Sequence, residues 1–313
     1  MAQKRRRERR SRGSAAAVNQ RPWREVRNCF PPMTPVSQDE LELIQDRSLQ
    51  VLEDVGMEFL HDDALDILEK AGADVNRDTR HVRLDRGLVT EAVAKAPSGF
   101  TLHARNPERT ITIGGNRVAF CPVASPPFVH DMDGGRREGN FKDYCNFLRL
   151  AQSLNALHFF GGYPVEPTDL PAATRHLDCL AAFVTLTDRA WHAYSLGAER
   201  IDDALSIISI ARGKSREELK SEPSIVTVIN ANSPLRYDTP MLDGLIAMAK
   251  HGQPVIITPF TLCGAMAPST VAGALTQQNA EALAGLTMVQ LTNPGSPVAY
   301  GGFTSNVDMK TGA

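Results

Sequence analysis

The sequence predicts an α/β protein: a TIM (β/α)8-type barrel, incomplete at about six strands, preceded by an α+β extension. Two observations carry this prediction. From residue 117 onwards, short apolar runs alternate with helical segments, an order typical of βαβ units and a parallel sheet. The phosphate-binding patterns GxGxxG and GxxxxGK[ST], which mark many doubly wound open sheets, are absent. A barrel is therefore favoured over a doubly wound sheet.

The first 35 residues are predicted to be a disordered basic tail and linker. Residues 4–12 read KRRRERRSR, and three prolines close the segment by residue 35. Such a basic run is typical either of a solvated tail or of a segment that contacts RNA, DNA or an anionic membrane. The solvated tail is favoured. The run has no apolar stretch, so it does not resemble a secretory signal.

Residues 36–116 are predicted to form a small α+β extension. Ser37 followed by Glu40 is a capping box, and the helix that it starts is expected to reach Val55, where Gly56 ends it. Further helices are expected at 62–71 and 86–96, a strand at 81–84, and a hairpin of strands at 101–104 and 110–113.

Residues 117–313 are predicted to form the barrel, truncated at its C-terminal side. The expected strands are apolar runs at 118–121, 158–162, 190–196, 224–230, 255–259 and 298–301. The expected helices lie at 141–154, 171–186, 199–212, 239–251 and 269–291. A barrel of this type needs eight strands, and five or six leave exposed edges. We therefore expect the chain to be the N-terminal part of a longer protein.

The composition excludes several classes of protein. Hydrophobic residues make up 42% and charged residues 22% of the 313, which allows a substantial core. A formal net charge of −2 argues against a general nucleic-acid binder. Five scattered cysteines without a CxxC pair fit a reducing cytoplasm, and Cys121 is more typical of a small buried residue than of a nucleophile. No apolar run approaches the ~18 residues of a transmembrane helix, so no membrane partner is expected.

The strand ends are the expected position of the site, because barrel enzymes bind substrates there. These ends are rich in aromatic and neutral polar residues and nearly free of Asp, Glu and Lys, which argues against general acid–base hydrolysis. Aromatic rings around a neutral polar cavity suit a tertiary or quaternary ammonium, at roughly 0.5–2 kcal/mol per ring. The alternative is that half of these rings only pack between sheet and helices. The candidate substrate-binding residues are Tyr163, His192, Tyr194, Asn230, Asn232, Thr258, Phe260, Tyr300, Phe303, Ser305 and Asn306.

The histidines have ordinary explanations beside functional ones. His192 and Tyr194 lie two residues apart and so face the same side of a strand, where His192 either orients a substrate or satisfies a core hydrogen bond. His176 is expected to face solvent or a neighbouring helix. His130 and Asp131 are a potential ligand pair, but no His/Cys/Asp set with metal spacing surrounds them, so no metal site is expected. No catalytic residue is assigned.

The C-terminal part of the sequence carries a resemblance. Residues 254–313, which end in GGFTSNVDMKTGA, resemble the trimethylamine:corrinoid methyltransferase family, including its glycine betaine-type members. VLEDVGMEFLHDDALDILEKAGADV at 51–75 and INANSPLRYD at 229–238 support the likeness, which runs from about residue 36 to the end. The segment 301–313 is the most specific part.

The resemblance implies a TIM barrel with an N-terminal extension and a cytoplasmic enzyme. Such an enzyme moves a methyl group from trimethylamine, or from a quaternary amine such as glycine betaine, to a cobalt corrinoid (cobalamin-type) on a separate small protein. The chain itself would bind no cofactor directly, and a homo-oligomer is compatible. Some members of the family carry pyrrolysine inside the barrel and others lack it. Full-length members are considerably longer than this chain.

Roles follow from placement at the strand ends. Aromatic side chains would hold the ammonium, and neutral polar side chains would donate hydrogen bonds to a carboxylate or similar group. The first set is Tyr163, Tyr194, Phe260 and Phe303, the second is Asn230, Asn232, Thr258 and Ser305, and Asn306 with Asp308 would shape the rim. Two alternatives stay open: a non-catalytic or inactive fragment that binds betaine-like cations, and an unrelated barrel lyase or aldolase. The latter would want a strand-end Lys, and none is present.

Overall fold

The computed structural model describes residues 19–306 and 310–311, so the basic run at 4–12 and Asp308 lie outside the described residues. A parallel four-stranded sheet lies at the centre, and all three of its pairings are parallel. Its order is β10 (Trp191–His192), β11 (Ile225–Ile229), β13 (Val255–Ile257) and β15 (Val298–Tyr300). The predicted α/β class is therefore confirmed. The described residues form no closed barrel.

The first two predicted barrel strands lie beside this sheet but do not form regular strands. His158 N donates to Phe120 O at 2.8 Å, and Ser125 N donates to Tyr163 O at 2.5 Å. Both segments advance by five residues between these two contacts, so they run parallel. Phe160 N donates to the residue that precedes β10 at 3.0 Å. The six predicted runs therefore lie side by side in chain order, although the first two make too few ladder bonds to form strands.

Helices follow the sheet segments close to where the sequence predicts them. The helix α4 begins with a capping box, in which Asn140 Oδ1 accepts from Asp143 N at 3.0 Å. The helix α6 ends at Gly213, which has a φ of 62° that favours glycine. The helices are α4 (Phe141–Ser153), α5 (Arg175–Leu186), α6 (Ala198–Arg212), α7 (Arg216–Ser221), α8 (Thr239–Lys250) and α9 (Val271–Thr292).

The N-terminal extension forms much as predicted. Its first helix starts at the expected capping box, where Ser37 N donates to Glu40 Oε2 at 2.7 Å. That helix, α1 (Gln38–Gln50), continues into the π-helical turn η1 (Val51–Val55). The remaining elements are β2 (Met57–Phe59), α2 (Asp62–Lys70), β3 (Asp74–Asn76), β4 (His81–Arg83), α3 (Arg86–Lys95), β5 (Gly99–Leu102), η2 (Pro107–Arg109) and β6 (Ile111–Gly114).

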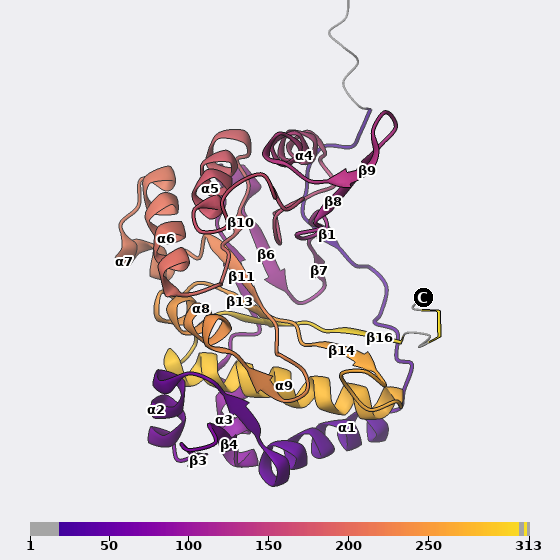
Figure 1. Ribbon diagram of the computed structural model, residues 1–313, viewed down its shortest axis with the longest axis vertical. Coiled ribbons are helices and arrows are strands. Elements are labelled where there is room, and N and C mark those ends of the chain that lie inside the picture. The colour runs from indigo at the N-terminus through magenta and orange to yellow at the C-terminus, as the bar shows by residue number, and fades with distance from the viewer. Residues whose placement is uncertain (1–18, 307–309, 312–313) are drawn as a thin grey trace, which may run out of the picture.

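The helix α9 joins the extension to the sheet. Figure 1 shows it lying between β13–β16 on one side and α1, α2 and α3 on the other. The short strand β12 (Arg236–Tyr237) leaves the loop after β11 and pairs in parallel with β2. Tyr237 packs so closely on α9 that a Cβ at Gly285 would lie 2.5 Å from the tyrosine oxygen. The extension and the later part of the chain therefore share one sheet and one long helix.

Several short strands were not predicted from the sequence. The strands β14 (Phe260–Cys263) and β16 (Phe303–Asn306) pair in parallel beyond β13 and β15. Two antiparallel pairs lie near the first sheet segment: β1 (Val26–Arg27) with β7 (Arg117–Val118), and β8 (Phe128–Asp131) with β9 (Gly135–Glu138). Among the described residues, no helix combines the length and hydropathy needed to cross a bilayer.

Candidate functional site

Three predicted site residues meet at the ends of the second and third sheet segments. The ring centroids of Tyr163 and Tyr194 are 5.0 Å apart, and those of His192 and Tyr194 are 5.8 Å apart. Tyr163 and His192 approach edge to face at 6.5 Å. The contact between His192 and Tyr194 confirms that these two side chains share a face of the strand. The segment that continues β10 thus places His192 and Tyr194 together, and the second sheet segment brings Tyr163 against both.

Two of these rings, those of His192 and Tyr194, border a hollow that we call the central hollow. It is lined by Ala124, Ser125, Gly161, Gly162, His192, Tyr194, Leu196, Val228, Asn230 and Met241, none of which is charged. Its volume of about 260 Å³ lies below the roughly 300–1,000 Å³ of pockets for drug-sized ligands, so it suits a small molecule. Close approach of the first two segments shapes one wall, where a Cβ on Gly162 would lie 2.4 Å from the Cβ of Ala124.

His192 is the most perturbed titratable group of the central hollow. Its side chain is 6% exposed, and burial lowers its pKa to about 4. The imidazole is therefore neutral at pH 7, so it does not repel a cation beside it. Its Nδ1 has no hydrogen-bond partner among the described residues. This atom is therefore available to a bound molecule in the hollow.

A second hollow, the rim hollow, lies beside the central hollow and shares Asn230 with it. It is lined by Asn230, Thr258, Phe260, Gly302 and Phe303. The two phenylalanines oppose each other in the β14–β16 pair and stack, with centroids 4.8 Å apart and planes 16° apart. Thr258 Oγ1 donates to Asn230 Oδ1 at 2.9 Å, which fixes the amide between the two hollows.

Five predicted site residues line neither the central nor the rim hollow, and one of them, Tyr163, lines a neighbouring polar hollow instead. Asn232 Nδ2 donates to Asp238 Oδ2 at 3.1 Å, and Asp238 N donates back to Asn232 Oδ1 at 3.1 Å, so this amide stabilises the start of α8. The other three, Tyr300, Ser305 and Asn306, lie on β15 and β16. Sequence position marks a strand end but not the height or direction of each side chain there.

Cys121 departs from its expected burial. The residue is exposed, because the segment after β7 forms no regular strand that would carry it into the core. Its thiol lies against the second sheet segment, where a Cβ on Gly161 would be 3.0 Å from the sulfur. Burial of part of the side chain raises the thiol pKa, so Cys121 does not have the lowered pKa of an activated nucleophile.

A polar hollow adjoins the central hollow and was not found from the sequence. It is lined by Tyr163, Glu166, Ala172, Arg175, His176, Tyr194, Leu196 and Arg200. Arg175 Nη1 donates to Glu166 Oε1 at 2.7 Å. His176 Nε2 lies 2.9 Å from Asp203 Oδ2 on α6, so His176 faces a neighbouring helix, which is one of its two expected positions. Its charged residues follow the strand ends by several residues, so a search of strand ends alone misses them.

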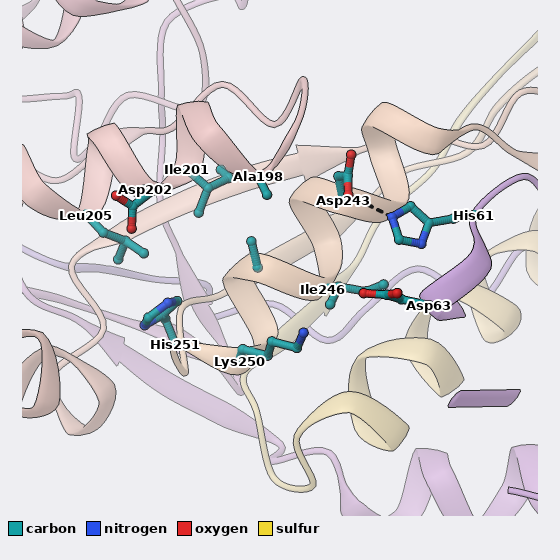
Figure 2. A pocket seen from close by; sticks show the side chains of 11 residues that line it. His61, Asp63, Ala198, Ile201, Asp202, Leu205, Asp243, Ile246, Lys250 and His251 are labelled. Carbon is teal, nitrogen blue, oxygen red and sulfur yellow. Dashed lines mark hydrogen bonds and ion pairs between the residues drawn. The ribbon is translucent and has the colours of Figure 1, made fainter. Parts of the chain in front are cut away.

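A fourth hollow, the outer groove, lies between α6 and α8 and contains no predicted site residue. Figure 2 shows His61 facing Asp243 at one end, with a ring nitrogen 2.7 Å from the carboxylate, and Lys250 and His251 at the other. Apolar side chains of α6 and α8 lie between these ends. Within the described ranges, no group of three or more His, Cys, Asp or Glu side chains could hold a metal ion.

Comparison with known proteins extends over the whole chain. A family model described as trimethylamine methyltransferase matches residues 2–313. A glycine betaine methyltransferase of Desulfitobacterium hafniense is 37% identical over 284 residues, which cover 91% of this chain and 59% of that protein. A trimethylamine methyltransferase of Methanosarcina mazei is 28% identical over 280 residues, covering 88% of this chain and 56% of that protein.

A proline betaine:corrinoid methyltransferase of Eubacterium limosum is 28% identical over 285 residues, which cover 88% of this chain and 57% of that protein. The chain thus spans a little under three fifths of the length of these relatives. The resemblance inferred from 51–75, 229–238 and 254–313 is confirmed by a match that spans nearly the whole sequence. The chain belongs to the trimethylamine methyltransferase family.

Proposed function

We propose that this chain contributes to transfer of a methyl group from a methylated amine to the Co(I) corrinoid of a partner protein. The observation that carries the proposal is the central hollow, where Tyr194 and uncharged neighbours surround a neutral His192 and Tyr163 packs against both rings. Such a lining favours an ammonium through cation–π attraction and offers no acid for hydrolysis. The three relatives are named as methyltransferases of glycine betaine, trimethylamine and proline betaine, which supports the same chemistry.

The residues of the central and rim hollows would mainly position the methyl donor. Tyr194 would face the ammonium with Tyr163 packed behind it, and Phe260 and Phe303 would close the site on the exposed side. Neutral His192 would hydrogen-bond through Nδ1 without adding positive charge. The corrinoid of the partner supplies a cobalt nucleophile, which the open rim must admit in line with the C–N bond, to about 3–3.5 Å. When that bond breaks, its electron pair stays on nitrogen, so a quaternary donor leaves as a neutral amine without a proton donor.

The proposed setting is a (β/α)8-type barrel. Six sheet segments lie in chain order without the reversal that a doubly wound sheet requires, which supports part of a barrel wall. On this reading the chain divides into a tail at 1–35, an extension at 36–116 and a partial barrel at 117–313. The five cysteines are all free thiols, which supports the cytoplasm as the compartment.

The test is an assay of methyl transfer to a reduced corrinoid protein, in which the absorbance change of the corrinoid reports the transfer. The 313-residue chain would be assayed with trimethylamine, glycine betaine and proline betaine. We expect turnover with at least one donor, and we expect Tyr194→Leu to raise its KM roughly 2- to 30-fold, the equivalent of one lost ring contact. Phe147→Leu, on the exposed face of α4, is the control and should change nothing.

The assay also separates the alternative of a non-catalytic binder. Binding of a donor without methylation of the corrinoid protein would support that alternative and reject the proposed activity for this chain. Equal effects of Tyr194→Leu and Phe147→Leu on KM would remove the central hollow from the proposal, even where turnover occurs.

A further inference from the structure

The polar hollow combines positive charge with buried polar atoms that lack partners. Within the described residues, Tyr163 Oη, Glu166 Oε2, Arg175 Nε and His176 Nδ1 make no hydrogen bond. Tyr163 is 1% exposed and His176 is 8% exposed, so bulk solvent does not supply hydrogen-bond partners for their polar atoms. Buried polar groups are normally hydrogen-bonded, because each unmade bond costs about 1–3 kcal/mol. Four such atoms around one hollow therefore indicate a bound polar group.

The two helices that border the polar hollow are also unusual at their N-termini. The N-caps of α5 and α6, Thr174 and Gly197, make no side-chain capping bond. In the part of the chain that the structure describes, each of the other seven α-helices has such a bond. Arg175 and His176 open α5, and Arg200 lies in the first turn of α6. Free N–H groups and the helix dipole make such ends attractive to an anion.

The charges of the polar hollow favour an anion rather than a cation. Arg175 and Arg200 contribute two positive charges against the one carboxylate of Glu166, which already accepts from Arg175. Among the described residues, Arg200 donates one hydrogen bond, to Ala172 O at 3.2 Å, which leaves most of its guanidinium available. Asp203 accepts a hydrogen bond from His176 Nε2, so this carboxylate is paired and does not oppose an anion in the hollow.

The polar hollow and the central hollow share Tyr194 and Leu196. We propose that the polar hollow binds the carboxylate of a zwitterionic methylated amine whose quaternary ammonium occupies the central hollow. This inference rests on the proposed function for the position of the ammonium. Arg200 is the principal carboxylate ligand, assisted by Tyr163 Oη. Asn232 was expected to bind the substrate carboxylate, but its amide is hydrogen-bonded to Asp238. Arg200 takes over this role in the proposal.

The proposal makes the substrate class a betaine. A donor with both charges satisfies the two hollows together, whereas a simple amine leaves the polar hollow without its anion. Arg200 is therefore a specificity residue and not a catalytic one. It affects which donor binds and leaves the reacting methyl group to the central and rim hollows.

The test is calorimetric titration of the full 313-residue chain with glycine betaine and with tetramethylammonium, which has the cation alone. We expect wild type to bind glycine betaine more tightly. Arg200→Gln should lower the affinity for glycine betaine by about tenfold or more, as expected for a lost hydrogen bond to a charged group. The same substitution should change the affinity for tetramethylammonium by less than about twofold. Arg149→Gln is the control, since this exposed arginine on α4 lines neither hollow and hydrogen-bonds its neighbour Asn146 at 3.2 Å.

Three results would overturn the inference: equal wild-type affinity for the two probes, equal weakening of both by Arg200→Gln, or binding of neither. A urea titration of each variant excludes loss of fold as the cause of weaker binding. Equal affinity with methyl transfer intact would reject the anion site and keep the proposed function. Tight, Arg200-dependent binding of glycine betaine without methyl transfer would keep the anion site and reject the function.

Discussion

The two sides of the candidate site differ in how the protein holds them. On the side of the second and third sheet segments, Tyr163 is 1% exposed and His192 is 6% exposed. On the side of β14 and β16, Phe303 is 59% exposed and stacks on Phe260. Burial changes protonation and fixes geometry, so the first side determines which charges a ligand meets. The exposed side supplies contact area that a partner or ligand can reach.

Phe183 on α5 packs behind the first side. Its ring stacks on Trp191 at 5.7 Å with planes 6° apart, and it meets Phe160 at 5.2 Å and Tyr163 at 6.1 Å. All four side chains belong to one core cluster. The position of Tyr163 therefore depends on packing behind the site, whereas Phe303 depends mainly on its partner ring.

The largest effect is expected when this packing is removed. Phe183→Ala should lower the free energy of unfolding by about 3–5 kcal/mol, because it leaves a cavity among aromatic side chains. Phe303→Ala should lower it by less than about 1 kcal/mol, since most of that ring is already exposed. Urea denaturation of both variants measures the difference. Similar losses for the two variants would show that the exposed pair is as deeply embedded in the fold as the buried side.

The buried side should make the stability of the fold depend on pH. Folded His192 stays neutral down to a pKa of about 4, whereas its ordinary value of 6.5 applies in the unfolded chain. Between these values only the unfolded chain gains the proton, so stability falls as the pH drops from 6.5 to 4, by at most about 3 kcal/mol from this residue. The check is unfolding free energy against pH for wild type, His192→Gln and the exposed control His130→Gln. An unchanged pH slope in His192→Gln would contradict the assignment.

Much of the fold was predictable because its signals are local. The capping box at Ser37 and the apolar runs at 224–230 and 255–259 depend on neighbouring residues, and the helices and strands there form close to where they were expected. The strands at 118–121 and 158–162 were wrong as regular strands, since pairing depends on backbone contacts between distant segments. The strand β12 was missed for the same reason, because its partner β2 lies far back in the chain.

The site was predictable to the extent that strand alternation determines it. Alternation explains why His192 and Tyr194 lie together, and the strand-end rule selected Asn230, Thr258 and the two stacked phenylalanines, which line the hollows. The strand-end rule does not select Arg200, because this residue lies in the first turn of α6 and not at a strand end. It lines the polar hollow because of the angle at which α6 leaves the sheet, which the sequence does not show. The absent capping residue at Gly197 was the available signal in the sequence.

The smallest effect is expected at the contact between the two sides. Thr258→Val keeps the shape of the side chain and removes only the hydrogen bond to Asn230 Oδ1. Loss of one partly exposed bond should lower the free energy of unfolding by no more than about 1 kcal/mol. The Asn230 side-chain amide resonances should shift in this variant and stay in place in Thr185→Val, whose hydroxyl bonds only within α5. If Thr258→Val instead destabilised the chain as much as Phe183→Ala, the two sides would unfold as one unit, and the exposed side could not adjust to a partner independently.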